Sequence, residues 1–144
     1  MSSASTTPIN PKGAVPTLEL DDGQILTENQ VILQYLGSLA PDSRLGPPPL
    51  GMERWRFLEL LNFIATELHK TIAILFKPDL SSKVREPVVA MIGQRLGLLQ
   101  EMLADKSYLT GDRFTIADAY AYVILNWADL HKIDLSPWPA LQSY

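Results

Sequence analysis

Residues 111–128, GDRFTIADAYAYVILNWA, join a helix-start motif to a long apolar run. The hydroxyl of Thr115 can cap the N–H of Asp118, while the Asp118 carboxylate can reach back to the N–H of Thr115. The same carboxylate would lie at the positive end of the helix dipole. The run that follows is apolar nearly all round, which predicts a helix buried at the centre of a bundle. We expect this capping box to serve folding and not chemistry.

Two longer helices are predicted before this one, from about Met52 to Phe76 and from near Ser82 to Ala104. Pro87 fits only the first turn of a helix, which favours a later start for the second helix. In each helix, apolar residues recur at helical spacing and should face a core. These residues are Trp55, Leu58, Leu61, Ala65, Leu68, Ile72 and Leu75 in the first helix, and Val84, Val88, Ile92, Leu96, Leu99 and Leu103 in the second.

The N-terminal third has a different pattern. Short strands are expected at Val15–Leu20 and Gln24–Leu26, because Asp22-Gly23 favours a tight hairpin turn between them. Thr27 is the expected N-cap of a helix over about 28–39, because its hydroxyl can accept a hydrogen bond from the first turn. This part therefore predicts a β-hairpin followed by a helix.

A proline-rich segment at 45–51, LGPPPLG, separates this part from the helices, because three successive prolines favour a stiff, extended connection. The predicted organisation is a small α/β module at 1–44, the linker at 45–51 and an all-α domain at 52–144. The fold class is accordingly α+β, with helix predominating.

Composition excludes several classes of function. The 144 residues carry a net charge of −4 and contain no cysteine. Scattered basic residues argue against a nucleic-acid partner. The only imidazoles, His69 and His131, lack metal-ligand spacing, and without thiolates no metal site is expected. No apolar run is long enough to cross a bilayer, and the first residues lack the apolar core of a secretory signal. We expect a cytoplasmic protein without a membrane partner.

Two places could hold a ligand. The free N–H groups at the helix start after Thr27 attract a carboxylate, and Glu28 could receive an ammonium group. Taken alone, these residues fit an ordinary capped helix better. In the first long helix, Asn62, Thr66 and His69 form a narrow polar stripe at i, i+4 and i+7. This stripe could line a cleft, form a solvated edge or contact another helix.

Together these segments resemble the cytosolic glutathione transferases, most closely their bacterial beta class. The resemblance spans about residues 9–144. It implies a partial thioredoxin-like module, consisting of the hairpin and its helix, followed by an incomplete form of the family's C-terminal helical bundle. The matching motifs are NPKGAVP at 10–16, LDDG at 20–23, LTEN at 26–29, Asn62 with TELHK at 66–70, and RFTIAD at 113–118.

The resemblance also implies a glutathione site. The Val15 backbone would pair with the cysteinyl part of glutathione, beside a cis Pro16. His69 would lie near the sulfur, as the one catalytic candidate, and Trp127 would line the pocket for a hydrophobic substrate unless it is a core aromatic. Glu67 could reach the site of a partner subunit. The remaining implied contacts are Glu28 and Asn29, at the γ-glutamyl end, and Asn62, Thr66 and Leu68; Asn29 is bulkier than the small residue usual there.

The implied function is conjugation of the glutathione thiolate to hydrophobic electrophiles by a homodimer, with glutathione as substrate and no cofactor. The family's first strand–helix–strand unit, which carries the cysteine nearest the sulfur in most beta-class members, has no counterpart here, and the family continues beyond the position of Tyr144. Enzymatic activity is therefore left open, and we expect weak catalysis or none from this chain alone. The alternatives are a non-catalytic interaction module and a truncated gene product.

Overall fold

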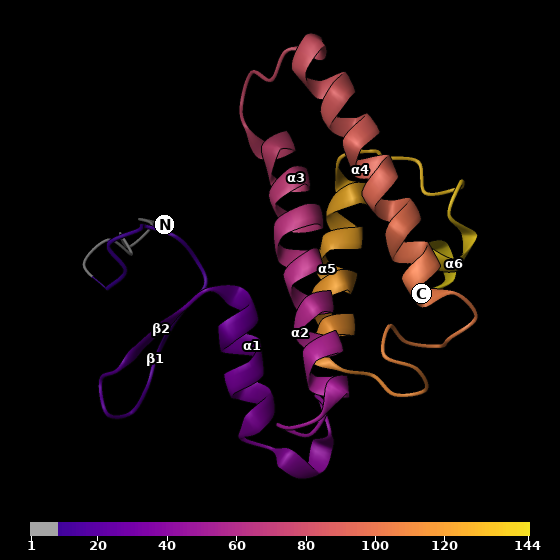
Figure 1. Ribbon diagram of the computed structural model, residues 1–144. Coiled ribbons are helices and arrows are strands. Elements are labelled where there is room, and N and C mark those ends of the chain that lie inside the picture. The colour runs from indigo at the N-terminus through magenta and orange to yellow at the C-terminus, as the bar shows by residue number, and fades with distance from the viewer. Residues whose placement is uncertain (1–8) are drawn as a thin grey trace. The chain divides into compact units, whose positions relative to one another are not determined.

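The computed structural model describes residues 9–144 and divides the chain into two compact units, Met1–Gly46 and Pro47–Tyr144. The start of the predicted α/β module, residues 1–8, lies outside the described residues. Helices predominate, and the described strands form one two-stranded sheet, which agrees with the predicted α+β class (Figure 1). Over residues 9–144, no helix combines the length and apolar character needed to cross a membrane.

The first unit is a β-hairpin followed by a helix. Strands β1 (Thr17–Glu19) and β2 (Ile25–Thr27) pair antiparallel, and the helix α1 spans Asn29–Ser38. The turn closes through a hydrogen bond from the N–H of Gly23 to the carbonyl of Leu20, 2.8 Å long. Gly23 has a φ of 81°, a conformation that glycine adopts without steric cost.

The expected cap at Thr27 is wrong. Thr27 is the last residue of β2 and pairs with Thr17, so its backbone belongs to the sheet ladder. The N-cap is Glu28, which has a φ of 70° and makes no capping hydrogen bond with its side chain. A short helical turn, η1 (Pro41–Ser43), follows α1.

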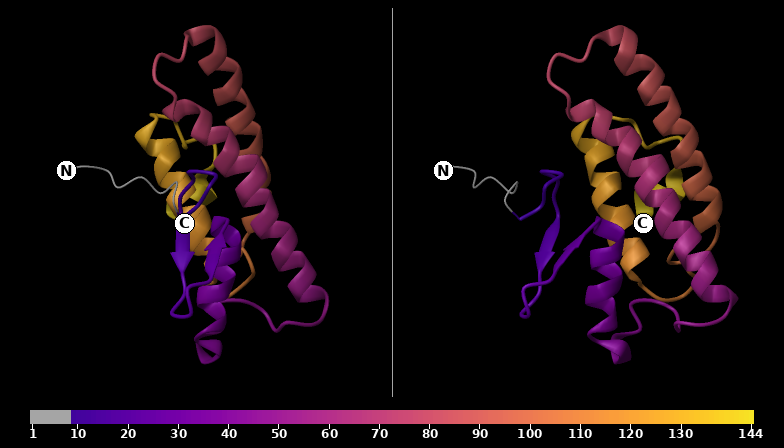
Figure 2. Two further views of the ribbon diagram at one scale, coloured as in Figure 1. Left: turned by 90° about the vertical axis from the view of Figure 1, so that its left-hand side faces the viewer. Right: turned by 60° about the vertical axis from the view of Figure 1, so that its left-hand side comes forward.

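The first predicted long helix is present as a continuous rod with changing helical geometry. It consists of α2 (Met52–Phe63), the π-helical segment η2 (Ile64–His69), α3 (Lys70–Ala73) and the 3₁₀ turn η3 (Ile74–Phe76). The rod runs beside α4 (Ser82–Leu103) and α5 (Ile116–Leu130), as Figure 2 shows from two further directions. A last short helix, α6 (Pro139–Ser143), ends the bundle.

The predicted core stripes are largely present, but Leu58 and Ala65 are only half-buried, and two further residues are exposed. Residues 57, 61, 64, 68, 72 and 75 are buried along the rod, and residues 88, 92, 96, 99 and 103 along α4. Trp55 is off the first stripe and is 64% exposed, which corrects the prediction that it faces the core. Val84 precedes the first buried position of α4 and is 47% exposed, so its predicted burial is also wrong. The later helix start suggested by Pro87 is wrong too, because α4 begins at Ser82 and contains this proline.

Helix α5 is buried on one face only, although its sequence predicted burial all round. Ala117, Ala121, Ile124 and Ala128 are buried, whereas the opposite face carries the exposed side chains of Tyr122, Val123 and Leu130. Within the described bundle, the rod packs against a single side of this helix. The apolar character of the outer face is therefore not explained by packing within the described residues.

Two glycines let the end of the chain pack against α4. A Cβ atom added to Gly93 would lie 3.4 Å from the indole of Trp138, and one added to Gly97 would lie 3.6 Å from it. Because the two glycines are one helical turn apart, they form a flat surface for this ring. The N–H of Ala140 also donates to Oε1 of Gln100 at 3.2 Å. These contacts dock α6 and bring Tyr144 towards α5.

The Asp118 carboxylate joins three segments of the bundle. It is 1% exposed and accepts four hydrogen bonds. Its Oδ1 accepts from the N–H of Leu109 at 2.8 Å and from the hydroxyl of Tyr144 at 2.6 Å. Its Oδ2 accepts from the N–H and the hydroxyl of Thr115, both at 2.6 Å. The predicted capping box is present, and burial beside this carboxylate raises the pKa of the Tyr144 hydroxyl, which keeps its proton.

Replacing Asp118 with alanine should destabilise the chain strongly, because buried donors would lose their acceptor. A lost cap and unsatisfied buried donors together predict a loss of about 3 kcal/mol in the free energy of unfolding. Urea unfolding followed by circular dichroism measures this loss. The control is Asp129→Ala, an exposed carboxylate on the same helix, which should change stability by less than about 0.5 kcal/mol. Equal effects of the two substitutions would contradict the role given to Asp118.

Candidate functional site

In the first unit, the predicted residues lie in the loop before β1 and at the start of α1. The Val15-Pro16 peptide bond is cis, as the resemblance implied, and Val15 is 75% exposed. Glu28 precedes α1, and its carbonyl accepts the first hydrogen bonds of that helix, from the N–H groups of Val31 and Ile32. Asn29 is the first helical residue. The exposed backbone of Val15 and the start of α1 therefore belong to one compact unit.

A buried asparagine, which the sequence analysis missed, holds this loop. Asn10 is 2% exposed, and its Nδ2 donates to the carbonyl of Ala14 at 2.8 Å and to the hydroxyl of Thr17 at 3.2 Å. Its Oδ1 accepts from the N–H of Lys12 at 3.1 Å. One side chain thus ties the loop before the cis bond to the first residue of β1.

Lys12 was also missed, and it meets Glu28 directly. The Nζ of Lys12 donates to Oε1 of Glu28 at 2.7 Å, and both side chains are 61% exposed. The Glu28 carboxylate therefore already holds an ammonium group in this structure. This is the chemistry that the sequence predicted for Glu28, supplied here from within the chain.

In the second unit, four of the predicted residues lie in the π-helical segment η2. Such segments are rare and frequently mark functional sites. Thr66 donates its hydroxyl to the carbonyl of Asn62 at 2.9 Å, and Thr71 donates to the carbonyl of Glu67 at 2.6 Å. Threonine hydroxyls that bond to the carbonyl four residues earlier often bend helices. Leu68 is 1% exposed as a whole residue and belongs to the buried core of the bundle.

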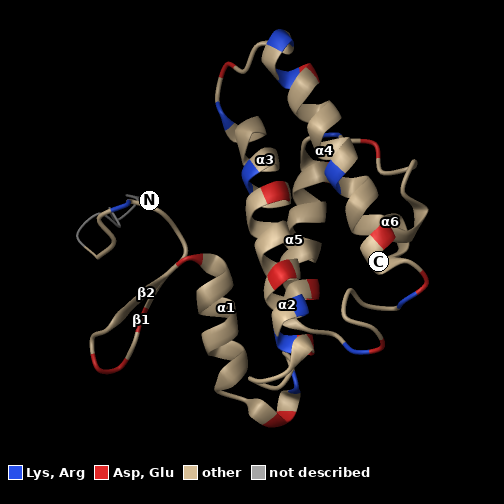
Figure 3. Ribbon diagram, in the orientation of Figure 1, with Lys and Arg blue, Asp and Glu red and all other residues tan. Residues whose placement is uncertain are grey.

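Glu67 is held by an arginine of α4. Its Oε2 accepts from Arg95 Nε at 3.1 Å and lies 3.0 Å from a terminal guanidinium nitrogen of Arg95. Both contacts use the same carboxylate oxygen. Elsewhere on the described helices, acidic and basic residues are interspersed (Figure 3).

His69 lies against α5 in a largely aromatic setting. Its Nδ1 is 2.6 Å from the hydroxyl of Tyr120, and the Trp127 ring meets it edge-on with centroids 4.9 Å apart. Burial lowers the pKa of His69 below its ordinary value of 6.5. The imidazole is therefore neutral at neutral pH, and it could assist a thiolate by donating a hydrogen bond but not by carrying a charge.

The aromatic contacts continue beyond the predicted site. Phe76 packs edge-on against Trp127 and His131, with centroids 5.0 and 4.4 Å apart. His69 and Phe76 are seven residues apart, as are Tyr120 and Trp127, so each pair lies on one face of its helix. That matched spacing is the signal that could have identified Tyr120 and Phe76 from the sequence.

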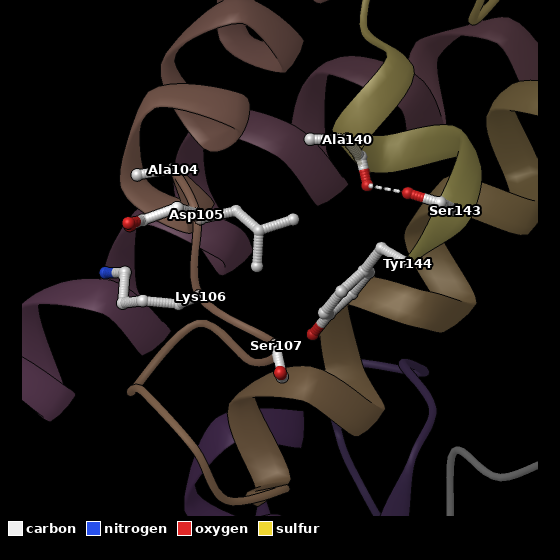
Figure 4. Close-up of a pocket in the computed structure, with 8 residues that line it drawn as sticks. Ala104, Asp105, Lys106, Ser107, Ala140, Ser143 and Tyr144 are labelled. Atoms are coloured by element: carbon white, nitrogen blue, oxygen red, sulfur yellow. Dashed lines mark hydrogen bonds between the residues drawn. The ribbon is translucent and has the colours of Figure 1, made fainter.

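A separate hollow of about 210 Å³ lies where α4 ends and α6 packs (Figure 4). It contains none of the predicted site residues. The phenol of Tyr144 forms one wall and points its hydroxyl into the bundle, where it donates to Asp118. We assign this hollow to the packing of the chain's end and not to ligand binding. Its lining residues are Leu103, Ala104, Asp105, Lys106, Ser107, Ala140, Ser143 and Tyr144.

Comparison with known proteins agrees with the resemblance seen in the sequence. Residues 63–144 match the model of the glutathione S-transferase C-terminal domain, and residues 2–47 match that of the N-terminal domain. The chain belongs to the glutathione S-transferase family. Members of this family use glutathione as a substrate.

Individual relatives agree with the beta-class prediction. Glutathione S-transferase GstA of Escherichia coli O157:H7 is 45% identical, over 88% of this chain and 63% of GstA. The bacterial beta-class glutathione S-transferase of Sphingomonas chungbukensis is 38% identical with a TM-score of 0.90, over 96% of this chain and 69% of that one. A sphingomonad glutathione S-transferase solved with glutathione is 37% identical with a TM-score of 0.90, over the same shares of the two chains.

These relatives support the transferase interpretation and do not favour the alternative of a non-catalytic module. The chain spans 63% of the length of GstA, somewhat less than two thirds. The roles of the individual site residues remain predictions.

The lowered pKa of His69 predicts how stability depends on pH. Because the unfolded chain binds a proton at this histidine near pH 6.5 and the folded chain only at lower pH, the free energy of unfolding should fall as the pH drops below 6.5. In His69→Gln this contribution is absent, so the decline between pH 7.5 and 5.5 should be shallower. Urea unfolding at both pH values measures it. Equal declines in the two proteins would contradict burial as the cause of the shift.

Proposed function

We propose that this chain binds glutathione and directs its thiolate at hydrophobic electrophiles. The observation that supports this most is the composition of the first unit. An exposed backbone beside the cis Val15-Pro16 bond, a helix start and the carboxylate of Glu28 occur together there. A free amino-acid terminus needs donors for its carboxylate and an acceptor for its ammonium group, and a helix start with an adjacent acid supplies both.

In this proposal, each predicted residue has a defined task. Val15 pairs its backbone with the cysteinyl part of glutathione, next to Pro16. His69 donates to the sulfur, and Trp127 borders the electrophile. The γ-glutamyl end is bound by Glu28 and Asn29, and further contacts come from Asn62, Thr66 and Glu67.

The reaction in this proposal is a nucleophilic substitution or addition. The deprotonated sulfur forms a bond to the electrophilic carbon. In a substitution, the leaving group departs with the electron pair of its broken bond, and the thiol proton passes to solvent. In an addition, the π bond of the electrophile breaks, its electron pair moves away from the attacked carbon, and the resulting anion takes a proton from solvent. A free thiol has a pKa near 8.5, so selective stabilisation of the thiolate increases the reactive fraction at neutral pH. We place the reaction in the cytosol, where glutathione is kept reduced.

Glutathione binding should depend on Glu28. Isothermal titration of reduced glutathione into the chain measures the dissociation constant, and Glu28→Gln should raise it by at least about tenfold, because a hydrogen bond to a charged group contributes about 1.5–3 kcal/mol. The matched control is Glu19→Gln, an exposed acid of the same unit that should leave binding unchanged. Unchanged affinity in Glu28→Gln would contradict the proposed site.

We further propose that two copies of the chain form a homodimer. On α4, Val84, Met91 and Leu98 recur every seven residues and are 47%, 41% and 44% exposed. This spacing places them on one helix face, which is apolar and open in the described chain. A second copy would cover this face, and Glu67 would then contribute to the partner's glutathione site.

Introducing a charge on this face should prevent self-association. Sedimentation velocity of Met91→Glu should give a monomer under conditions where the unchanged chain sediments as a dimer, because a buried unpaired carboxylate costs several kcal/mol. Lys83→Glu, which alters charge at an exposed position of the same helix, should remain dimeric. A monomeric unchanged chain at about 50 μM would contradict the proposal, since a dimer with a dissociation constant of about 1 μM is largely formed at that concentration.

A further inference from the structure

Tyr120 makes the only hydrogen bond that the described structure gives to the His69 side chain. Tyr120 lies on α5 and is 5% exposed, and its hydroxyl oxygen is 2.6 Å from Nδ1 of His69, the last residue of η2. The two rings meet edge-on at 89°, with centroids 5.7 Å apart. The contact joins residues 51 positions apart and links the π-helical segment to the central helix.

The direction of this hydrogen bond follows from the chemistry of its two groups. A neutral imidazole has one nitrogen that donates and one that accepts. Its accepting nitrogen is a stronger base than a phenol oxygen, and a phenol with a pKa near 10 is a stronger acid than a neutral imidazole N–H. The stable arrangement has the Tyr120 hydroxyl donating to Nδ1, which leaves the proton of His69 on Nε2.

We propose that Tyr120 is the positioning residue for His69, fixing the histidine as the Nε2–H tautomer and setting the orientation of its ring. Trp127 assists by packing against the same ring at 81°. Nε2 forms no hydrogen bond with any of the described residues, so its N–H is the donor that His69 can offer to a ligand. The identity of the ligand atom, the glutathione sulfur, is the only part of this proposal that rests on the proposed function.

The tautomer can be measured without glutathione. In the folded chain with ¹⁵N-labelled histidine, long-range ¹H–¹⁵N correlation spectra at pH 7.5 distinguish the two neutral forms. The Nε2–H form of His69 should exceed the other by about tenfold, as a hydrogen bond of ordinary net strength predicts. Predominance of the Nδ1–H form in the unchanged chain would overturn the proposal, and this outcome requires no variant.

A variant comparison then assigns the preference to Tyr120. Tyr120→Phe removes only the hydroxyl and should shift His69 towards the tautomer mixture of free histidine. Tyr122→Phe, which changes a 58% exposed tyrosine of the same helix, should leave the spectrum of His69 unchanged. If Tyr120→Phe leaves the ratio of the two tautomers unchanged in a folded chain, the assignment is wrong. Failure of the unchanged chain to bind glutathione would overturn the proposed function while leaving the tautomer result intact.

Discussion

The buried carboxylate of Asp118 is the interaction on which the helical unit depends. Its four hydrogen bonds join the loop at Leu109, the N-cap at Thr115 and the end of the chain at Tyr144 to a single pair of oxygens. Together they determine where α5 begins. Tyr120 lies two residues after Asp118 and Trp127 nine residues after it, so the two aromatic groups that contact His69 are carried by a helix whose start is fixed in this way. The hydrogen bonds of Asp118 therefore stabilise the helical unit and also position the two aromatic residues that contact His69.

Local motifs were read correctly from the sequence where their partners are close along the chain. The capping box of Thr115 and Asp118 and the hairpin turn at Gly23 are of this kind. The cis bond before Pro16 and the family itself came from the resemblance, which drew on several motifs together. The wrong predictions concern residues whose state depends on pairing or packing with other segments. Thr27 is not an N-cap because it pairs with Thr17 in the sheet. Trp55 is exposed because it lies on the side of the rod that does not face the core.

In the candidate site, too, some residues were predicted from the sequence and others were not. Glu28 and His69 were singled out by residue type and position, whereas their partners Lys12 and Tyr120 were not, because Lys12 carries no signal of its own and the signal of Tyr120 lies only in its spacing from Trp127. The π-helical geometry of η2 also escaped prediction, since ordinary helical spacing was assumed throughout. Tyr120 could have been identified from the sequence by its seven-residue spacing from Trp127, because His69 and Phe76 on the rod have the same spacing.

The two acidic residues of the proposed site differ in how firmly they are held within the chain. The pair between Glu28 and Lys12 is exposed, and exposed pairs contribute little net stability, so exchanging the lysine for a ligand costs little. Glu67 is held more firmly, but both contacts from Arg95 fall on Oε2. A ligand could therefore bind to Oε1 while the arginine stays in place, and the guanidinium would then hold the carboxylate in position without being displaced.

The neutral state of His69 limits what it can contribute to the proposed reaction. An imidazolium would attract a thiolate as a charge, but burial disfavours that form. A hydrogen bond from Nε2–H to a charged sulfur contributes about 1.5–3 kcal/mol, which would lower the pKa of a thiol by about one to two units from 8.5. That brings the thiol to between about one quarter and three quarters ionised at pH 7. In the proposed reaction, a neutral histidine in the Nε2–H tautomer would therefore be sufficient for a useful thiolate fraction, and the contact with Tyr120 would hold it in that tautomer.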